Sequence, residues 1–182
     1  MSQKLSPDAQ AERRTRILDA ARWCFLNFGF SRTSLEDIAQ RAVISRTLLY
    51  RIFKDKEDIF IQCFDAWILS RVQPASQAAR QRGTVRQRLR AVCDCLVLDS
   101  WSEMVAAPMA DEFQDVYERL RPTVAWKHRE GVLGCVLQVL NDADTAQVFL
   151  LALEGQFADR PSLETMKARI DILVTHFAEG SE

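Results

Sequence analysis

The sequence predicts an all-α protein with about nine helices. Apolar residues recur at intervals of three and four along most of the 182-residue chain, which is the pattern of helices that bury one face. No stretch alternates apolar and polar residues as a half-buried strand does. Apolar residues make up 48% of the chain and charged residues 27%, which are ordinary values for a globular protein that buries a core.

The first helix is predicted from about Pro7 to Phe28. Ser6 can cap it, proline suits the first helical position, and Asp8 lies near the positive end of the helix dipole. Gly29 is expected to end the helix. Its apolar stripe offers a surface on which two further helices can pack to make a three-helix domain.

Two short helices joined by a tight corner are predicted within residues 33–53. Thr33 or Ser34, each followed three residues later by an acid, can form a capping box at the start of the first helix, which should end near Arg41. Ser45 can cap the second helix. The free face of that second helix carries hydrogen-bond donors and two cations, on Arg46, Thr47, Tyr50 and Arg51. This pattern is typical of a helix-turn-helix, whose second helix enters the DNA major groove.

The charge distribution favours the same end of the chain for DNA. Residues 1–56 hold 11 Lys and Arg against 6 Asp and Glu, a net of +5, whereas residues 57–182 hold 13 against 19, a net of −6. Phosphate contacts dominate the affinity of proteins for nucleic acids. A basic segment alone can be a solvated surface, but beside a helix-turn-helix pattern it favours a DNA-binding role.

The chain closely resembles the DNA-binding domain of the tetracycline-repressor (TetR) family of bacterial transcription regulators. The matching elements, which follow one another without a gap, are Ser34, Asp37-Ile38-Ala39, Ala42-Val43-Ile44-Ser45, Leu49-Tyr50-Arg51-Ile52-Phe53 and Lys54-Asp55-Lys56-Glu57-Asp58-Ile59. The resemblance implies a three-helix DNA-binding domain at residues 1–55 and a helical effector-binding and dimerisation domain at residues 56–182.

Two positions depart from the family pattern. Val43 stands where the family usually has glycine, and a β-branched residue with positive φ would be strained by about 1–3 kcal/mol. We therefore expect this turn to be reshaped, with the first short helix running further into it. Thr47 stands where the family often has glycine or proline, so the base preference does not follow from the resemblance.

Helices also fill the rest of the chain. They are expected from Asp55 towards Arg71, from Gly83-Thr84 to Trp101, around Ala110–Leu120, and beyond Pro122 to Leu140. Pro74 predicts a kink or break after the first of these. No flexible Gly/Ser linker follows the helix-turn-helix, which indicates a stiff connection.

The last two helices, Asp142–Phe157 and Ser162–Ala178, carry wide apolar stripes that something must cover. In the resembled family the final two helices pack against their twins in a symmetric four-helix interface. We therefore expect a homodimer through these two helices. The alternative is that they only close the core of the monomer.

The resemblance and the helical projection agree on the residues expected to face double-stranded DNA. Arg46, Thr47 and Arg51 should reach bases or nearby phosphates, and Arg46 best suits guanine, because a guanidinium can pair with O6 and N7 together. Ser45 belongs to the same DNA-facing set. Contacts to phosphates, which fix the register, are expected from Thr33, Ser34, Tyr50, Lys54 and Lys56. Tyr50 could instead be a partly buried core tyrosine.

The resemblance also implies a small-molecule effector. Aromatic residues fall in the helices that line the effector pocket of TetR-like proteins, namely Trp67, Trp101, Phe113, Tyr117 and Trp126. Aromatic walls with a few polar groups are typical of ligand sites, but such residues also occur in ordinary cores. The sequence does not fix the chemistry of the effector.

Neither a metal site nor catalysis is expected. Cys93 and Cys95, with His128 or His176, lack a known zinc spacing, and the two cysteines would point about 200° apart on a helix. The chain has no Gly-rich phosphate loop, nucleophile elbow or His-Glu-x-x-His motif. We therefore expect no cofactor and no enzyme.

Nothing in the sequence suggests a membrane. No run approaches the roughly 18 apolar residues of a membrane span, and no apolar signal-peptide core is present. The five scattered cysteines suit a reducing compartment. We expect a cytoplasmic protein.

Together these features predict a dimeric DNA-binding repressor that binds a near-palindromic operator and is released by a small hydrophobic or amphipathic ligand. Three alternatives stay open, namely a regulator without a small-molecule switch, an activator, and a helical metal- or ligand-binding carrier from another class of protein. The sequence identifies neither the operator, the effector nor the regulated genes.

Overall fold

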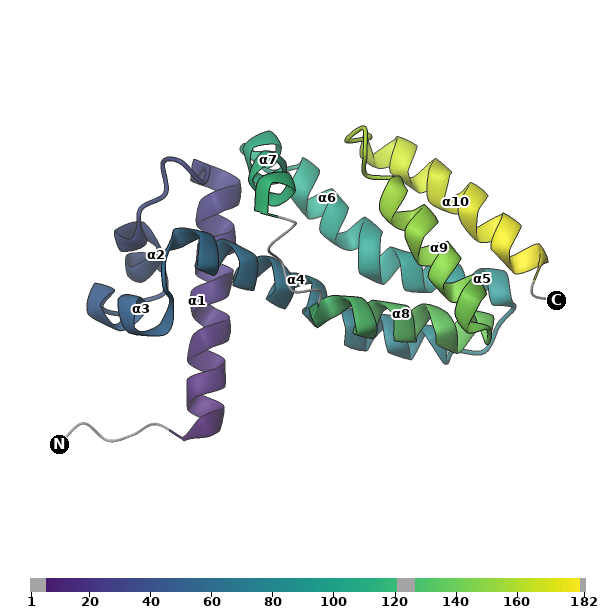
Figure 1. The fold of residues 1–182 in the computed structure, drawn as a ribbon, viewed down its shortest axis with the longest axis horizontal. Helices are drawn as coiled ribbons and strands as arrows, with labels where there is room; N and C mark the ends of the chain where they lie inside the picture. The colour runs from purple at the N-terminus through teal and green to yellow at the C-terminus, as the bar shows by residue number, and fades with distance from the viewer. Residues whose placement is uncertain (1–5, 121–126, 181–182) are drawn as a thin grey trace. The chain divides into compact units, whose positions relative to one another are not determined.

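The computed structural model describes residues 6–120 and 127–180, and these form helices without strands (Figure 1). The elements are α1 (Pro7–Phe28), α2 (Leu35–Arg41), α3 (Arg46–Ile52), α4 (Lys56–Ala79), α5 (Val85–Cys93), the π-helix η1 (Asp94–Leu98), α6 (Asp99–Val105), α7 (Ala110–Leu120), α8 (Lys127–Leu140), α9 (Ala143–Gly155) and α10 (Leu163–Glu179). Because α5, η1 and α6 follow one another directly, the described residues form nine helical stretches. The predicted all-α class is confirmed.

The chain divides into two compact units. One comprises Met1–Trp67 with Ala107–Ala125, and the other comprises Ile68–Ala106 with Trp126–Glu182. Since α4 belongs partly to each unit, packing does not mark where a DNA-binding domain would end. The functional boundary after residue 55 therefore stays a prediction.

The helices begin where the sequence supplies capping side chains. Ser34 accepts a hydrogen bond from the Asp37 N–H (3.1 Å), and the Asp37 carboxylate accepts one from the Ser34 N–H (2.7 Å). Of the two possible capping boxes, the one at Ser34 is therefore the one that forms. Ser45 caps α3 by accepting from the Leu48 N–H (3.2 Å). Ser6, Thr84, Asp142 and Ser162 cap α1, α5, α9 and α10 in the same way. Each cap satisfies an N–H that the helix itself leaves unpaired.

The turn between α2 and α3 is not reshaped, contrary to the sequence-based expectation. Val43 has a φ of 55°, and α2 ends at Arg41. The Val43 N–H donates to the Gln40 carbonyl (3.1 Å) and the Ile44 N–H donates to the Ala39 carbonyl (3.0 Å). These are the two bonds of a Schellman motif, so the carbonyls of Ala39 and Gln40 are paired while a valine takes the position that favours glycine.

Of the kink or break predicted at Pro74, the break is absent, and the kink stays a prediction. The helix α4 continues to Ala79 with Pro74 inside it. Asp55 caps the start of this helix by accepting from the Asp58 N–H (2.8 Å). One helix therefore replaces the shorter one expected from the sequence.

Aromatic rings form the centre of the first unit. The ring of Phe60 on α4 lies 5.5 Å from that of Phe25 on α1 and 4.7 Å from that of Phe113 on α7, between centroids. All three side chains are fully buried. Aromatic pairs at such distances contribute about 0.5–1.5 kcal/mol beyond their burial. Around this cluster α2 packs on α1, and α3 packs on α2.

The helix α7 is joined to the end of α1 by polar contacts as well. The Met109 N–H donates to the Leu26 carbonyl (3.0 Å), and the Ser31 N–H donates to the Glu112 carboxylate (2.7 Å). Gly29 lies directly beneath that carboxylate with a φ of 87°. The φ favours glycine, and a Cβ at this position would also displace the Glu112 carboxylate.

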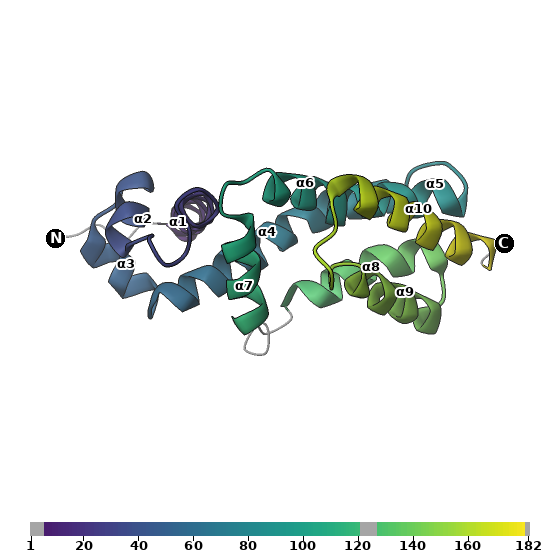
Figure 2. The same cartoon turned by 90° about the horizontal axis from the view of Figure 1, so that it is seen from above.

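In the second unit α10 packs along α5, and α8 packs along α9 (Figure 2). The largest fully buried side chains of this unit are Leu89, Val92, Phe149, Met166 and Ile170. Arg90 on α5 pairs with Asp94 (2.8 Å) and with Asp171 of α10. The ion pairs therefore tie α5, η1 and α10 together.

Replacing Val43 by glycine should stabilise the protein. The substitution relieves about 1–3 kcal/mol of backbone strain and adds about 0.5–1 kcal/mol of chain entropy to the unfolded state, so we expect the free energy of unfolding to rise by about 1 kcal/mol. Urea denaturation at matched protein concentration measures it. Val43→Ala keeps a Cβ at the same φ and should gain much less. A gain with alanine equal to that with glycine would contradict the strain.

Replacing Gly29 by alanine should lower the free energy of unfolding by about 2 kcal/mol or more, because the new Cβ is strained and displaces Glu112. Gly134→Ala is the matched control, since its Cβ would meet nothing within 4 Å and alanine favours a helix interior by about 1 kcal/mol. The two variants should therefore shift the urea midpoint in opposite directions. A tolerated Gly29→Ala would show that the loop and α7 are not held as described.

Candidate nucleic-acid interface

The outer face of α3 is polar and basic. Leu49 is buried beneath the helix and Phe53 directly after it, so the opposite face of the helix is turned outwards. The exposed residues of this face are Arg46, Thr47, Tyr50 and Arg51. The structure thus brings together the four residues expected from the sequence to face DNA on this helix.

Arg46 and Tyr50 contact each other on this face. The Arg46 guanidinium donates a hydrogen bond from Nη2 to the Tyr50 hydroxyl (3.0 Å) and lies 5.4 Å from the centroid of the tyrosine ring. That hydrogen bond raises the pKa of Arg46. Tyr50 is 51% exposed, so the alternative role of a partly buried core tyrosine does not apply.

Ser34 and Ser45 are exposed at the starts of α2 and α3. The Ser34 hydroxyl donates to the Asp37 carboxylate (2.6 Å), so its proton is engaged within the capping box. The hydrogen bonds from the Ser34 hydroxyl and N–H lower the pKa of Asp37. At Ser45 the hydroxyl accepts from the backbone, which leaves its proton able to serve a phosphate.

Thr33 does not suit the role expected for it. Its side chain is 1% exposed, and its hydroxyl donates to the carbonyls of Gly29 (2.6 Å) and Cys24 (3.2 Å). A buried hydroxyl with its proton engaged cannot reach a phosphate. Thr33 therefore fastens the end of α1 and leaves the set of candidate DNA contacts.

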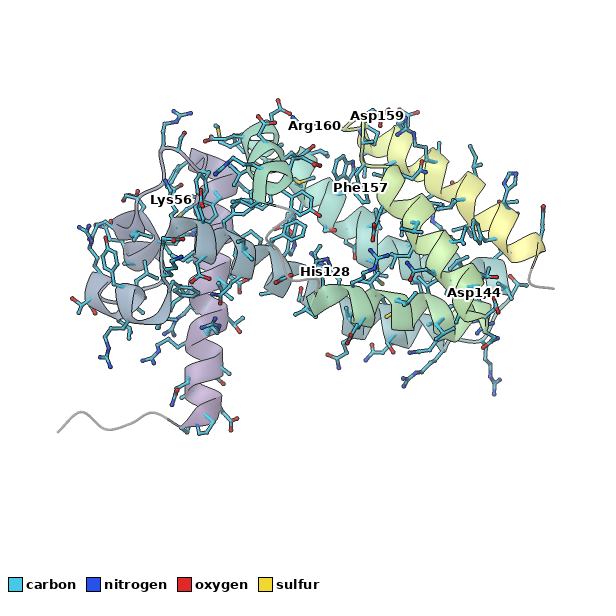
Figure 3. All side chains as sticks on the ribbon, in the orientation of Figure 1. Lys56, His128, Asp144, Phe157, Asp159 and Arg160 are labelled. Atoms are coloured by element: carbon cyan, nitrogen blue, oxygen red, sulfur yellow. The ribbon has the colours of Figure 1, made fainter. Side chains whose placement is uncertain are left out.

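Lys56, labelled in Figure 3, holds the loop before α2. Its Nζ donates to the carbonyls of Phe30 (2.7 Å) and Thr33 (3.0 Å), is 3.4 Å from that of Ser31, and lies 4.5 Å from the centre of the Phe30 ring. The sequence predicts only a phosphate contact for this lysine. It does not predict the bonds to the loop, because the carbonyl partners lie more than 20 residues away along the chain. The phosphate contact stays a prediction. Lys54 is exposed on the neighbouring turn.

Three of the five residues expected around an effector form one aromatic cluster in the first unit. Trp67 and Phe113 are buried with their ring centroids 6.1 Å apart. Tyr117 stacks on Phe64 at 4.3 Å, and Phe64 meets Trp67 edge-on at 6.4 Å. Their effector role stays a prediction, because the same packing serves the core of the unit.

Trp101 lies in the second unit. It is buried, its indole N–H donates to the Pro161 carbonyl (3.1 Å), and its ring meets Phe157 (labelled in Figure 3) at 5.1 Å. These contacts fix the tryptophan within its own unit. Trp126 lies outside the described residues.

The cysteines of the chain are free thiols. Burial raises the pKa of all five, and it raises that of Cys93 to about 12. Neutral thiols are poor nucleophiles and poor metal ligands. Within residues 6–120 and 127–180, no group of three or more His, Cys, Asp or Glu residues is arranged to hold a metal ion, and no helix has the length and apolarity to cross a membrane.

Comparisons with known proteins match this end of the chain to DNA-binding regulators. Residues 17–63 match the family model described as "Bacterial regulatory proteins, tetR family". The HTH-type transcriptional activator FasR of Mycolicibacterium smegmatis is 32% identical over 83 residues, which cover 46% of this chain and 38% of that protein. The HTH-type transcriptional regulator AcrR of Shigella flexneri is 42% identical over 65 residues, or 36% and 30% of the two chains. The alignments thus span less than half of either relative.

Solved structures resemble the chain over nearly its whole length. A TetR-like transcriptional regulator from Rhodococcus sp. RHA1 has a TM-score of 0.59 at 20% identity, covering 97% of this chain and all of that one. A TetR family regulator from Marinobacter aquaeolei VT8 has a TM-score of 0.58 at 18% identity, covering 97% of this chain and 89% of that one. At such identities the likeness establishes the fold.

Replacing Lys56 by methionine should lower the free energy of unfolding by about 1–3 kcal/mol, because three loop carbonyls lose a charged donor. Lys54→Met is the matched control and should stay within about 0.5 kcal/mol, as expected for an exposed surface position. Urea denaturation of both variants tests this. Equal stability of the two variants would show that Lys56 does not hold the loop.

Proposed function

This chain belongs to the TetR family of bacterial regulatory proteins, and from that premise we propose that it is a DNA-binding transcriptional regulator. More narrowly, we propose a homodimeric repressor that a small hydrophobic or amphipathic ligand releases from a near-palindromic operator. The observation that carries the DNA-binding part is the outward, basic face of α3, fixed by the burial of Leu49 and Phe53 beneath it.

In the proposed complex α3 lies in the major groove. Arg46 would pair with a guanine edge, because its guanidinium matches O6 and N7, and Thr47 and Arg51 would meet neighbouring bases or phosphates. Contacts to DNA phosphates, which fix the register of the protein on the duplex, would come from Ser34, Ser45, Tyr50, Lys54 and Lys56. The positive net charge of residues 1–56 supports this assignment.

Apolar side chains on the last two helices support the proposed dimer. Val148 and Leu151 on α9 are 55% and 54% exposed, and Ile172 on α10 is 61% exposed. Helices that pack against a second copy would cover these side chains, as the apolar cores of homodimer interfaces do. A dimer would present two α3 helices to half-sites about 34–36 Å apart or a multiple of that distance.

A ligand switch would act through α4. This helix carries Phe64 and Trp67 of the aromatic cluster and begins at Lys56, which binds the loop before α2. A ligand that displaced α4 would therefore move the support of the helix-turn-helix. Release requires that the ligand bind the DNA-free state more tightly by the coupling free energy, typically about 1–3 kcal/mol.

A second candidate is a regulator that activates transcription, since FasR is named an activator. A regulator without a ligand switch is the third. Thermal-shift screening of metabolites separates switched from unswitched regulators, and transcription in vitro from a selected operator separates repression from activation. A helical carrier of metals or ligands would bind no duplex selectively.

Loss of Arg46 or Arg51 should weaken binding to the operator. Selection from a random duplex library with the purified protein first supplies that operator. Arg46→Ala and Arg51→Ala should then each lower affinity about 5- to 150-fold, the loss of a base or strong phosphate contact. Arg86→Ala is the matched control, an exposed arginine on α5 outside the helix-turn-helix, and should leave affinity unchanged.

Charge on the apolar face of the last two helices should separate the proposed dimer. Leu151→Glu combined with Ile172→Glu would bury two carboxylates in the interface, which is strongly unfavourable, so sedimentation should report a monomer. Leu69→Glu places one carboxylate at another exposed leucine, on α4, and should sediment as the wild type does. A double variant that stayed dimeric would place the interface elsewhere.

A further inference from the structure

Arg46 and Tyr50 lie one turn apart on α3, and their contact leaves much of the guanidinium free. One N–H of Nη2 is used by the tyrosine hydroxyl at 3.0 Å, and the ring lies 5.4 Å from the guanidinium carbon. A guanidinium has five N–H donors in a rigid fork. Two of the remaining donors are enough for the paired contact to guanine O6 and N7.

We propose that Tyr50 is a positioning residue that orients the guanidinium of Arg46 and thereby sets the base preference at the position that Arg46 reads. This inference rests on the proposed DNA-binding function and adds a role for a side chain that is otherwise assigned to a phosphate. It predicts that the effect of Tyr50 on binding depends on the sequence of the DNA.

The gain in affinity comes from ordering the Arg46 side chain before the protein binds DNA. A free arginine side chain occupies many rotamers, and fixing it on DNA lowers affinity by about 2- to 10-fold for each immobilised side chain. The hydrogen bond and the ring already restrict Arg46 in the free protein. On a duplex with another base pair at that position, Arg46 makes no paired contact and gains nothing from being ordered in advance. The preference for the correct base pair therefore rises by that factor.

The contact with Tyr50 distinguishes the two arginines of this face. Arg51, the other arginine of this face, has no such contact with Tyr50 among the interactions of the described residues.

The tyrosine hydroxyl can still donate its own proton to a phosphate, because it only accepts from Arg46. The phosphate contact and the positioning of Arg46 differ in how their effect on affinity depends on the DNA sequence. A phosphate contact weakens binding to every duplex by one factor when it is lost. A positioning contact is felt only where Arg46 meets its preferred base pair.

The test uses the full-length protein and the duplex that it selects from a random library. Affinities are measured for the wild type, Tyr50→Phe, Arg46→Ala and the double variant, on the selected duplex and on duplexes substituted at each single position. We expect Tyr50→Phe to lose about 3- to 10-fold more affinity on the selected duplex than on duplexes substituted at the base pair that Arg46→Ala identifies. In the Arg46→Ala background Tyr50→Phe should lose one and the same factor on every duplex, which is the share of its phosphate contact.

A uniform loss on all duplexes, equal in the presence and absence of Arg46, would overturn the inference and leave Tyr50 as a phosphate contact. An unchanged affinity of Tyr50→Phe on the selected duplex would overturn it as well. Failure of the wild type to select any duplex is a different result, which would overturn the proposed function and this inference with it. Since Tyr50 is half exposed, the variant should fold, and a thermal melt checks this.

Discussion

Burial of one face of α3 is the constraint on which the candidate interface depends. The helix has seven residues, and isolated helices shorter than about 12–15 residues are marginal in water. Its stability therefore comes from Leu49 and Phe53, which are buried beneath it, and from the cap at Ser45. Once that underside is fixed, the polar and basic residues on the opposite face of the helix point outwards. The surface that would meet DNA thus follows from apolar packing rather than from its own polar contacts.

The helix-turn-helix is held from both sides of its first helix. After α2, the corner at Val43 keeps the hydrogen bonds of a glycine turn at the cost of a strained valine. Nothing in the structure explains a valine there, since its side chain is 85% exposed. Before α2, Lys56 binds the carbonyls of the loop and Glu112 binds the Ser31 N–H. The loop is therefore fastened by α4 and α7, the helices that also supply the aromatic cluster.

Features with local causes were predictable from the sequence, and those that depend on distant partners were not. The capping residues, the polar face of α3 and the helical class follow from spacing alone. Thr33 is polar and near a helix start, which favours a DNA contact, yet its hydroxyl donates to the carbonyls of Cys24 and Gly29. The hydrogen bonds from Lys56 to the loop before α2 join residues distant in the sequence, so spacing does not predict them. Placement of α7 beside α1 needed contacts across some 80 residues of chain, such as Ser31 with Glu112.

In the proposed complex α3 reads guanine from the major groove at two related half-sites. Methylation interference on the selected duplex measures this contact, because methylation of guanine N7 blocks the major-groove edge that Arg46 would contact. We expect interference at guanines in two symmetric clusters, about 10 base pairs or a multiple apart, and loss of these signals in Arg46→Ala. Selective binding that is insensitive to N7 methylation would contradict the proposed contact.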